Sequence, residues 1–372
     1  MNNKKIFLNI YRNFKYFIFK LAYGEINTII NVKNNKKIII KKIFFKDLTA
    51  YNLYNIPKGR LYSDTTNDTA FILNKSLIKE PSFQYRHQKN SRIINGPPYE
   101  NFVIKNGTPN LMKKIKGNVF SLLTGGAGKN NYWHWLFDVL PRIGILEKSN
   151  FKPKIDYYLL PSLSRKYQTQ TLQGLKISFS SLIDGEKNKH IICNNLTSVD
   201  HPINFNNNPS MSILKIPIWV IKWLRKKYTK NSYKNLNIPK KIFINRESDS
   251  NVSNRNIVNN NEVKKTLIDL GFIIITLSDL NFKEQVELFK NANFIIGLHG
   301  AGFANIVFSK PGTRIIEMAS KDNGDVILRL ANKCKLNYKR IIGKNLLSKL
   351  RFQNGNNLFD VKKLKKLILS FK

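Results

Sequence analysis

Short apolar runs alternate with helically spaced apolar positions through the second half of the chain. The runs predict strands at residues 241–245, 272–276, 294–297 and 314–318. Apolar residues at i, i+3 and i+4 predict helices at about 259–270, 282–291 and 325–334, and a short helix after Gly302. Continuously apolar strands that alternate with amphipathic helices are typical of a parallel sheet covered on both faces. We therefore expect a Rossmann-like domain in this half.

The first half gives a weaker pattern. Apolar runs such as 38–40 and 71–73 stand among polar turns and indicate mixed α and β structure between about 38 and 98. An aromatic helix is predicted to begin near Asn131, and strands are predicted at 157–160 and 191–193. The stretch NFNNNP at 204–209 has neither helical nor strand periodicity. We place the domain boundary there, which gives domains 1–205 and 206–372.

Both ends of the sequence carry amphipathic segments. In residues 1–24, apolar side chains recur at helical spacing, while Arg12, Lys15 and Lys20 interrupt the run before the roughly 20 residues that a bilayer span needs. These charges also argue against a signal peptide. A helix at a membrane interface and a first helix packed on the protein both fit the pattern. A second amphipathic helix is predicted at 358–371, for which packing on a neighbouring domain is favoured over membrane binding.

Composition adds a large positive charge. The 372 residues include 63 Lys and Arg against 23 Asp and Glu, for a net charge of +40, and 42% of them are apolar. That apolar share supports folded cores, and the length is typical of two domains. Because lysine pairs are spread along the whole sequence, a solvated surface is favoured over a polyanionic partner as the explanation of the charge. Such a partner would be an anionic membrane surface, a phosphorylated substrate or nucleic acid.

The chain has two cysteines, Cys193 and Cys334. They are too few for a disulfide framework or a cysteine-rich zinc site, so a reducing compartment is the simpler expectation. No metal site is predicted.

One loop of the second half has the composition of an anion site. In an open parallel sheet, ligands bind at the carboxyl ends of the strands. The strand at 294–297 leads into a loop that contains His299, Gly300, Ala301, Gly302 and Asn305. Glycines allow close approach of the backbone to a ligand, and a helix start offers unpaired N–H donors to an anion.

Two other strand ends add charged groups. Arg246 follows the strand at 241–245, and the loop beyond it carries Arg255 and Asn259. Glu317 follows the apolar core of the strand at 314–318, where a carboxylate is suitably placed to accept two hydrogen bonds from a ribose diol. Taken singly, each residue is better explained by a structural role: Arg246 as a surface ion-pair partner, His299 as a hydrogen-bonded loop histidine and Glu317 as a solvated strand end. Together with the glycine-rich loop they predict a nucleotide diphosphate site.

Several other sites lack their sequence signatures. Gly297, Gly300 and Gly302 do not form the G-x-G-x-x-G order, which disfavours a dinucleotide cofactor. Leu123 stands where a P-loop needs its first glycine, and Asn130 where it needs Ser or Thr. The motifs of zinc proteases, zinc deaminases and serine hydrolases do not occur.

A dense polar and aromatic cluster lies at 131–142, which reads NYWHWLFDVLPR. His134 and Asp138 are four residues apart, so on a helix they share a face. A hydrogen-bonded aspartate orients a histidine and keeps it basic, as a general base acting on a hydroxyl requires. The alternative is that the aromatic residues form core and His134 is a partnered core residue.

Three stretches resemble the signature blocks of glycosyltransferase family 61. They are NYWHWLFDVLPRI, then KKIFINR with Arg255 and Glu262 downstream, and GLHGAGFANIVFSKPGTRIIEM. Phe282 and Gln285 also fit the family's pattern. These blocks extend from about Asn131 to Met318, and the first hundred residues match no block.

The resemblance implies a particular fold and reaction. The fold would be an α/β, GT-B-like pair of Rossmann-like domains facing a cleft, with the nucleotide sugar on the C-terminal one and amphipathic helices at the ends. Transfer would be inverting and would not depend on a bound metal. The expected donor is a nucleotide-diphosphate sugar, foremost a UDP-sugar, with no further cofactor.

The resemblance also implies roles for the candidate residues. Asp138 or His134, acting as a pair, would deprotonate the acceptor hydroxyl. The diphosphate would be stabilised by Arg246, Arg255 and the backbone N–H groups after His299. Other implied roles are that Glu317 holds the ribose and that Asn305 contacts phosphate or braces its loop.

Bacterial proteins of this kind take part in capsular or lipopolysaccharide assembly. The resemblance therefore implies a glycan or lipid-linked acceptor and a cytoplasmic enzyme that rests on the inner membrane, where its cationic surface would meet anionic lipids. The alternative from another class is a non-enzymatic polyanion-binding protein, chiefly a nucleic-acid binder. The dispersed charge and the lack of a recognised reader motif disfavour a specific nucleic acid as partner.

Overall fold

The chain divides into two compact units, Met1–Val220 and Ile221–Lys372. The computed structural model describes residues 3–64, 66–89, 93–123, 127–151, 154–203, 214–230, 238–246, 256–345 and 356–371. The predicted linker at 204–209 lies outside these ranges, and the division falls beyond it, within the helix α8 (Ile218–Tyr228).

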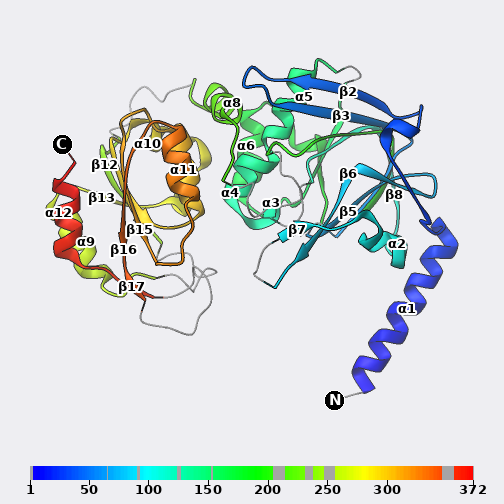
Figure 1. The fold of residues 1–372 in the computed structure, drawn as a ribbon, viewed down its shortest axis with the longest axis horizontal. Helices are drawn as coiled ribbons and strands as arrows, with labels where there is room; N and C mark the ends of the chain where they lie inside the picture. The colour runs from blue at the N-terminus through cyan, green and yellow to red at the C-terminus, as the bar shows by residue number, and fades with distance from the viewer. Residues whose placement is uncertain are drawn as a thin grey trace. The chain divides into compact units, whose positions relative to one another are not determined.

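Unit 1, residues 1–220, is built on one large mixed sheet (Figure 1). Its strands in the described ranges are β1 (Thr28–Ile30), β2 (Ile39–Phe44), β3 (Ala50–Pro57), β4 (Arg60–Ser63), β5 (Asp68–Leu73), β6 (Ser76–His87), β7 (Ile93–Asn95), β8 (Lys113–Ser121), β9 (Tyr157–Leu160), β10 (Leu182–Asp184) and β11 (His190–Val199). The main path is β1-β6-β5-β4-β11-β8-β9-β10, with β2 attached through β3 and β7 through β6.

Helical segments of unit 1 are mostly short. The α-helices among its described residues are α1 (Asn3–Tyr23), α2 (Phe102–Asn106), α3 (Ala127–Asn130), α4 (Tyr132–His134), α5 (Pro141–Ser149) and α6 (Lys166–Gly174). Three 3-10 turns, η1 (Val32–Asn34), η2 (Pro98–Glu100) and η4 (Phe179–Ser181), and one π turn, η3 (Trp135–Val139), complete the described part.

The expectation of a Rossmann-like first domain is wrong. In the described part of unit 1 only β8–β11 and the pair β1–β6 run parallel, and the remaining pairs are antiparallel. The link from β5 to β6 shows why, because it consists of Asn74 and Lys75 alone, with Asn74 at a positive φ of 57°. A link of two residues joins antiparallel strands, whereas parallel strands need a long crossover.

Unit 2, residues 221–372, contains the predicted parallel sheet. The described strands are β12 (Lys241–Asn245), β13 (Ile273–Thr276), β14 (Phe294–Leu298), β15 (Arg314–Ala319) and β16 (Asn337–Ile342), in the order β13-β12-β14-β15-β16, and a small pair, β17 (Lys344–Asn345) with β18 (Asn357–Leu358). The four strands predicted from apolar runs are confirmed to within one residue at each end. The fifth, β16, escapes prediction because its sequence NYKRII is half polar.

Helices cover both faces of this sheet (Figure 1). The α-helices in the described part are α9 (Asn260–Asp269), α10 (Phe282–Asn291), α11 (Val326–Lys333) and α12 (Val361–Leu369), and the 3-10 segments are η5 (Leu277–Asp279) and η6 (Ala301–Phe308). Figure 1 shows α9 and α12 on one face, and α10 and α11 on the other. Leu364 and Ile368 of α12 join the buried cluster that also holds Val263 and Leu267 of α9, so α12 packs on its own unit.

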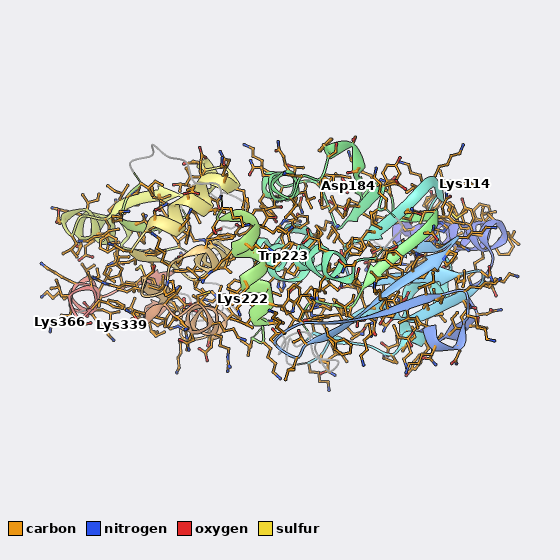
Figure 2. The ribbon with its side chains drawn as sticks, turned by 90° about the horizontal axis from the view of Figure 1, so that it is seen from above. Lys114, Asp184, Lys222, Trp223, Lys339 and Lys366 are labelled. Carbon is orange, nitrogen blue, oxygen red and sulfur yellow. The ribbon has the colours of Figure 1, made fainter. Side chains whose placement is uncertain are left out.

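Lysines project from elements of both units. Lys114 of β8, Lys222 of α8 and Lys366 of α12 are exposed, and Figure 2 labels them along the molecule. Lys339 of β16 turns instead to α12, where its Nζ donates to Ser370 O over 2.9 Å. The positive charge is therefore spread over many elements, as the lysine pairs in the sequence indicate.

The thiols of both cysteines are buried. Neither Cys193 nor Cys334 forms a disulfide. Burial raises the pKa of Cys193 to about 12 and that of Cys334 to about 11, so both stay protonated at neutral pH.

The C-terminal end of α1 is fixed to unit 1 through a buried histidine. The Tyr23 ring meets the His190 ring edge-on at 4.9 Å, and Tyr23 O accepts a hydrogen bond from Arg60 Nη1 over 3.2 Å. Arg60 Nη2 lies 3.2 Å from His190 Nε2, and because a guanidinium only donates, Nε2 must be the unprotonated nitrogen. His190 Nδ1 then donates to Asn110 O over 2.9 Å. Burial lowers the pKa of His190 to about 4, so the fold needs its neutral form.

No helix in the described ranges combines the length and the hydropathy needed to cross a membrane.

The need for a neutral His190 predicts that the fold loses stability in acid. The pKa of His190 is about 6.5 in the unfolded chain and about 4 in the folded one, so its contribution to the unfolding free energy is complete above pH 6.5 and is lost as the pH falls toward 4. We expect His190→Gln, which keeps an acceptor for Arg60, to reduce the loss of unfolding free energy between pH 6.5 and pH 4 by about 2 kcal/mol. Urea unfolding followed by tryptophan emission measures it, since Trp133, Trp135 and Trp219 belong to unit 1.

The exposed His87 provides the control. His87→Gln should leave the pH dependence as in the wild type. An unchanged pH dependence in His190→Gln would contradict the neutral, arginine-bonded state of His190.

Candidate active site

The segment that carries His134 and Asp138 is an interrupted helix. Asn131 begins it, because its side chain accepts a hydrogen bond from Trp133 N over 3.0 Å. After α4 the chain widens into the π turn Trp135–Val139, in which Leu140 N donates to Trp135 O, five residues back, over 3.0 Å. Pro141 follows, and proline neither donates a backbone hydrogen bond nor fits against the carbonyl four residues earlier in a regular α-helix. The π turn accommodates this proline, and turns of this kind are frequent at functional sites.

His134 and Asp138 contact each other directly, as their spacing predicts. His134 Nδ1 lies 2.5 Å from Asp138 Oδ2. The Asp138 side chain is 9% exposed and the His134 side chain 22%. The carboxylate is therefore the inner member of the pair, and the imidazole is the member that solvent or a substrate can reach.

Charged neighbours keep Asp138 ionised. Burial alone raises the pKa of Asp138, but the electrostatic interaction and hydrogen bond with His134, together with the positive charge of Arg142, outweigh burial and hold that pKa below its ordinary value. An ionised carboxylate only accepts, so His134 Nδ1 carries the proton and Nε2 is left as the acceptor in the neutral ring.

Two further groups surround the pair. Burial lowers the pKa of His201, just after β11, to about 4, so it is neutral at neutral pH. Burial also lowers the pKa of Arg142 to about 10, which leaves it charged. Within the described residues, Asp138 Oδ1 and Arg142 Nε are buried without a hydrogen-bond partner.

Unit 2 has a pocket at the point where its strand order reverses. The chain enters the sheet at β12, places β13 on one side and then continues on the other side with β14. A pocket of about 260 Å³ is lined by the ends of β12 and β14, by the segment before α9 and by the first residue of α9, namely by Phe243, Ile244, Asn245, Arg246, Asn256, Ile257, Asn260 and Leu298. The switch point of a doubly wound sheet is where such folds bind nucleotides. This pocket therefore lies where the sequence predicts the donor site.

Arg246 spans this pocket and the glycine-rich loop. Its Nη1 donates to His299 O over 2.9 Å. A Cβ on Gly300 would lie 2.8 Å from that same nitrogen, so only glycine leaves room for the guanidinium in its present place. Ala301 and Gly302 then begin η6, whose start has no side-chain cap. Arg246 and the loop predicted with it are thus in contact.

Glu317 is fully buried inside the sheet. One oxygen bonds His299 Nδ1, and the other bonds the Tyr338 hydroxyl and Arg340 Nε, the last over 3.0 Å. Arg340 continues to Asp325 Oδ1 at 3.1 Å. Burial and the carboxylate raise the pKa of Tyr338, so its hydroxyl remains a donor. Since both carboxylate oxygens already accept hydrogen bonds, the arrangement favours a role in positioning His299 over the predicted contact with ribose.

The remaining predicted residues act as braces or lie outside the described ranges. Asn305 Nδ2 donates to Gln285 Oε1 over 2.9 Å, which matches bracing of the loop. Asn259 exchanges hydrogen bonds with the Phe359 backbone at 2.8 and 3.1 Å. Arg255 is not among the described residues.

Sequence reasoning missed four residues that complete these clusters. Tyr338 and Arg340 escape notice because β16 itself was not predicted. His201 lies beside the Asn-rich stretch taken as a linker, and Arg142 was noted only as part of the aromatic motif. The alternation of Tyr338 and Arg340 in NYKRII was the available signal, because it places both on one face of a strand.

No group of three or more His, Cys, Asp or Glu side chains that could hold a metal occurs in the described part of the chain.

Residues 132–316 match the family model described as Glycosyltransferase 61. The match begins in the segment of His134 and ends in β15. The protein is a glycosyltransferase. It belongs to glycosyltransferase family 61, as the resemblance of its sequence blocks indicates.

Comparison with solved structures gives a distant similarity. The dodecameric iron-containing heptosyltransferase TibC, in complex with ADP-D-beta-D-heptose, aligns with a TM-score of 0.34 and 14% sequence identity, over 86% of this chain and 84% of that chain. No curated protein matches the sequence.

The Glu317 network predicts a large difference between two carboxylates that share one arginine. Arg340 pairs with the buried Glu317 and with Asp325, whose side chain is 52% exposed. Glu317→Ala should lower the unfolding free energy by about 3–5 kcal/mol, because it leaves Arg340 and His299 without their buried partner. Asp325→Ala should lower the unfolding free energy by less than about 1 kcal/mol, because an exposed ion pair contributes little to stability. Urea unfolding followed by circular dichroism measures both, and equal costs would contradict the central place of Glu317.

Proposed function

We propose that the protein is an inverting, metal-independent glycosyltransferase. It moves a sugar from a nucleotide-diphosphate sugar, foremost a UDP-sugar, to a glycan or lipid-linked acceptor in the synthesis of a capsular polysaccharide or lipopolysaccharide.

The hydrogen bond between His134 and Asp138 carries this proposal. Inverting transfer needs one general base and no covalent intermediate. A half-buried imidazole, held in one tautomer by an ionised carboxylate, meets that need. Of the two residues predicted to share this role, His134 is the proton acceptor in our proposal and Asp138 orients it.

The reaction then runs in one displacement. The acceptor oxygen attacks the anomeric carbon as its proton passes to His134 Nε2. The bond between that carbon and the diphosphate oxygen breaks on the opposite face, and the nucleoside diphosphate leaves with the electron pair.

Unit 2 holds the donor in this proposal. The pocket at the strand-order switch takes the nucleotide, and the diphosphate lies against Arg246 and the backbone N–H groups that follow His299. Glu317, with Tyr338 and Arg340, fixes the ring of His299 against this site.

We also propose a cytoplasmic location, peripheral to the inner membrane. Lipid-linked acceptors are held at that surface, and a net charge of +40 favours its anionic lipids.

The base assignment predicts the effect of two substitutions. His134→Gln should lower kcat by about 10²- to 10⁴-fold, since proton transfer loses its acceptor. Asp138→Asn should lower it at least as much, because an amide at this position donates to Nδ1 and moves the ring proton to Nε2. The KM for the donor should change little in either variant. Release of nucleoside diphosphate under saturating acceptor measures kcat.

His87→Gln is the matched control, because His87 is exposed on β6 of the same unit. It should retain wild-type kcat. Near wild-type transfer by both His134→Gln and Asp138→Asn would rule out this pair as the base.

The donor site predicts a selective thermal shift. Of UDP, GDP, CMP, NAD and a short DNA duplex, one nucleoside diphosphate should raise the melting temperature, with and without EDTA. Arg246→Ala should raise the Kd for that nucleotide about tenfold or more. Gly300→Ala should do the same, because its Cβ would displace the guanidinium from a position 2.8 Å away.

Arg329→Ala, an exposed arginine on α11, should leave the Kd unchanged. Loss of the shift with EDTA would contradict metal independence. A response to DNA alone, abolished by salt, would instead support the polyanion-binding alternative.

A further inference from the structure

Helix α1 exposes a continuous apolar face. Phe7, Ile10, Phe14, Phe17, Ile18 and Leu21 each lie three or four residues from another member of the set, and their exposed fractions run from 43% for Ile18 to 69% for Phe7 and Leu21. Isolated apolar residues are normal on a protein surface, but a contiguous apolar stripe along a helix of 21 residues marks an interaction site.

The opposite side of the helix is already fixed to unit 1. The Tyr16 ring meets the Phe102 ring edge-on at 5.9 Å, and Tyr23 is held by His190, Arg60 and Met112 N. Figure 1 shows α1 leaving the sheet of unit 1 from this attachment, with its N-terminal part projecting beyond the sheet. These contacts hold the side of α1 that carries Tyr16 and Tyr23 against the rest of unit 1, so the apolar stripe is directed away from it.

Charge identifies the partner of this stripe. The sequence of α1 contains five cations, Lys4, Lys5, Arg12, Lys15 and Lys20, and no acidic residue. An apolar stripe on a helix whose charged residues are all cations is complementary to a bilayer that contains anionic lipid. A second copy of the helix is a poorer partner, because pairing two such helices would bring like charges together.

We propose that α1 lies in the interface of an anionic bilayer, with its apolar face among the acyl chains and its cations at the level of the lipid phosphates. This inference deepens the peripheral location given under the proposed function and names the element and the lipid class. In this proposal α1 lies parallel to the membrane surface, as an interfacial amphipathic helix does.

Vesicle flotation of the full chain tests the proposal directly. The vesicles are pure phosphatidylcholine, or phosphatidylcholine with one third phosphatidylglycerol, at low and at physiological salt. We expect the wild type to float with the phosphatidylglycerol vesicles and not with pure phosphatidylcholine. The double variant Phe7→Gln/Phe14→Gln should bind at least tenfold more weakly, and both positions are exposed, so the fold should tolerate it.

A matched control removes as much exposed apolar surface elsewhere in unit 1. Leu48 and Phe179 are 94% and 70% exposed, and Leu48→Gln/Phe179→Gln should float like the wild type. The variant Lys5→Gln/Arg12→Gln should bind more weakly at low salt and depend less on salt.

Three results would overturn the proposal. These are a wild type that ignores anionic vesicles at low salt, equal binding by the α1 double variant, and a wild-type dimer in solution that the α1 double variant converts to monomer. Transfer to a soluble acceptor separates this inference from the proposed function, because the α1 double variant should keep wild-type kcat there. A wild type that does not bind vesicles but still transfers sugar to the soluble acceptor would overturn the inference about α1 and leave the proposed function unaffected.

Discussion

A buried carboxylate needs partners to remain ionised, and this constraint shapes both clusters of the molecule. In unit 1, Asp138 is satisfied on one oxygen by His134 and is held ionised by nearby basic groups. In unit 2, Glu317 of β15 accepts hydrogen bonds from His299, which follows β14, and from Tyr338 and Arg340 of β16. Each carboxylate thereby fixes the ring of a histidine that lies within the residues matched by the family model.

Much of unit 2 could be predicted from the sequence because its central strands β12, β14 and β15 are buried on both faces. Continuous apolar runs give β12, β13, β14 and β15 nearly residue for residue, and helical spacing gives α10 with the observed ends. Strand β16 is different because it is largely only partly buried and half of its residues are polar, so it gives no apolar run. Missing β16 also hid the partners of Glu317, and a carboxylate that closes a buried network was taken as a ligand for ribose.

Unit 1 resisted prediction for another reason. The pairs β2–β3, β4–β5 and β5–β6 are antiparallel and joined by short turns, and the register of the sheet also depends on contacts between segments far apart in the chain, such as β3 with β11. The spacing of His134 and Asp138 did predict their contact, because residues four apart meet on a helix. The π turn between them, and the buried Arg142 and His201, depend on packing that no local pattern records.

The buried thiols have a practical consequence for any study of this chain. Cys193 and Cys334 are protonated and enclosed, so alkylating reagents that need an accessible thiolate should pass them by. A cysteine introduced at an exposed position would then be the reactive one, without removal of the native pair. Spectroscopic labels placed singly in either unit would report on that unit alone, and pairs of labels would give the distances between units during turnover.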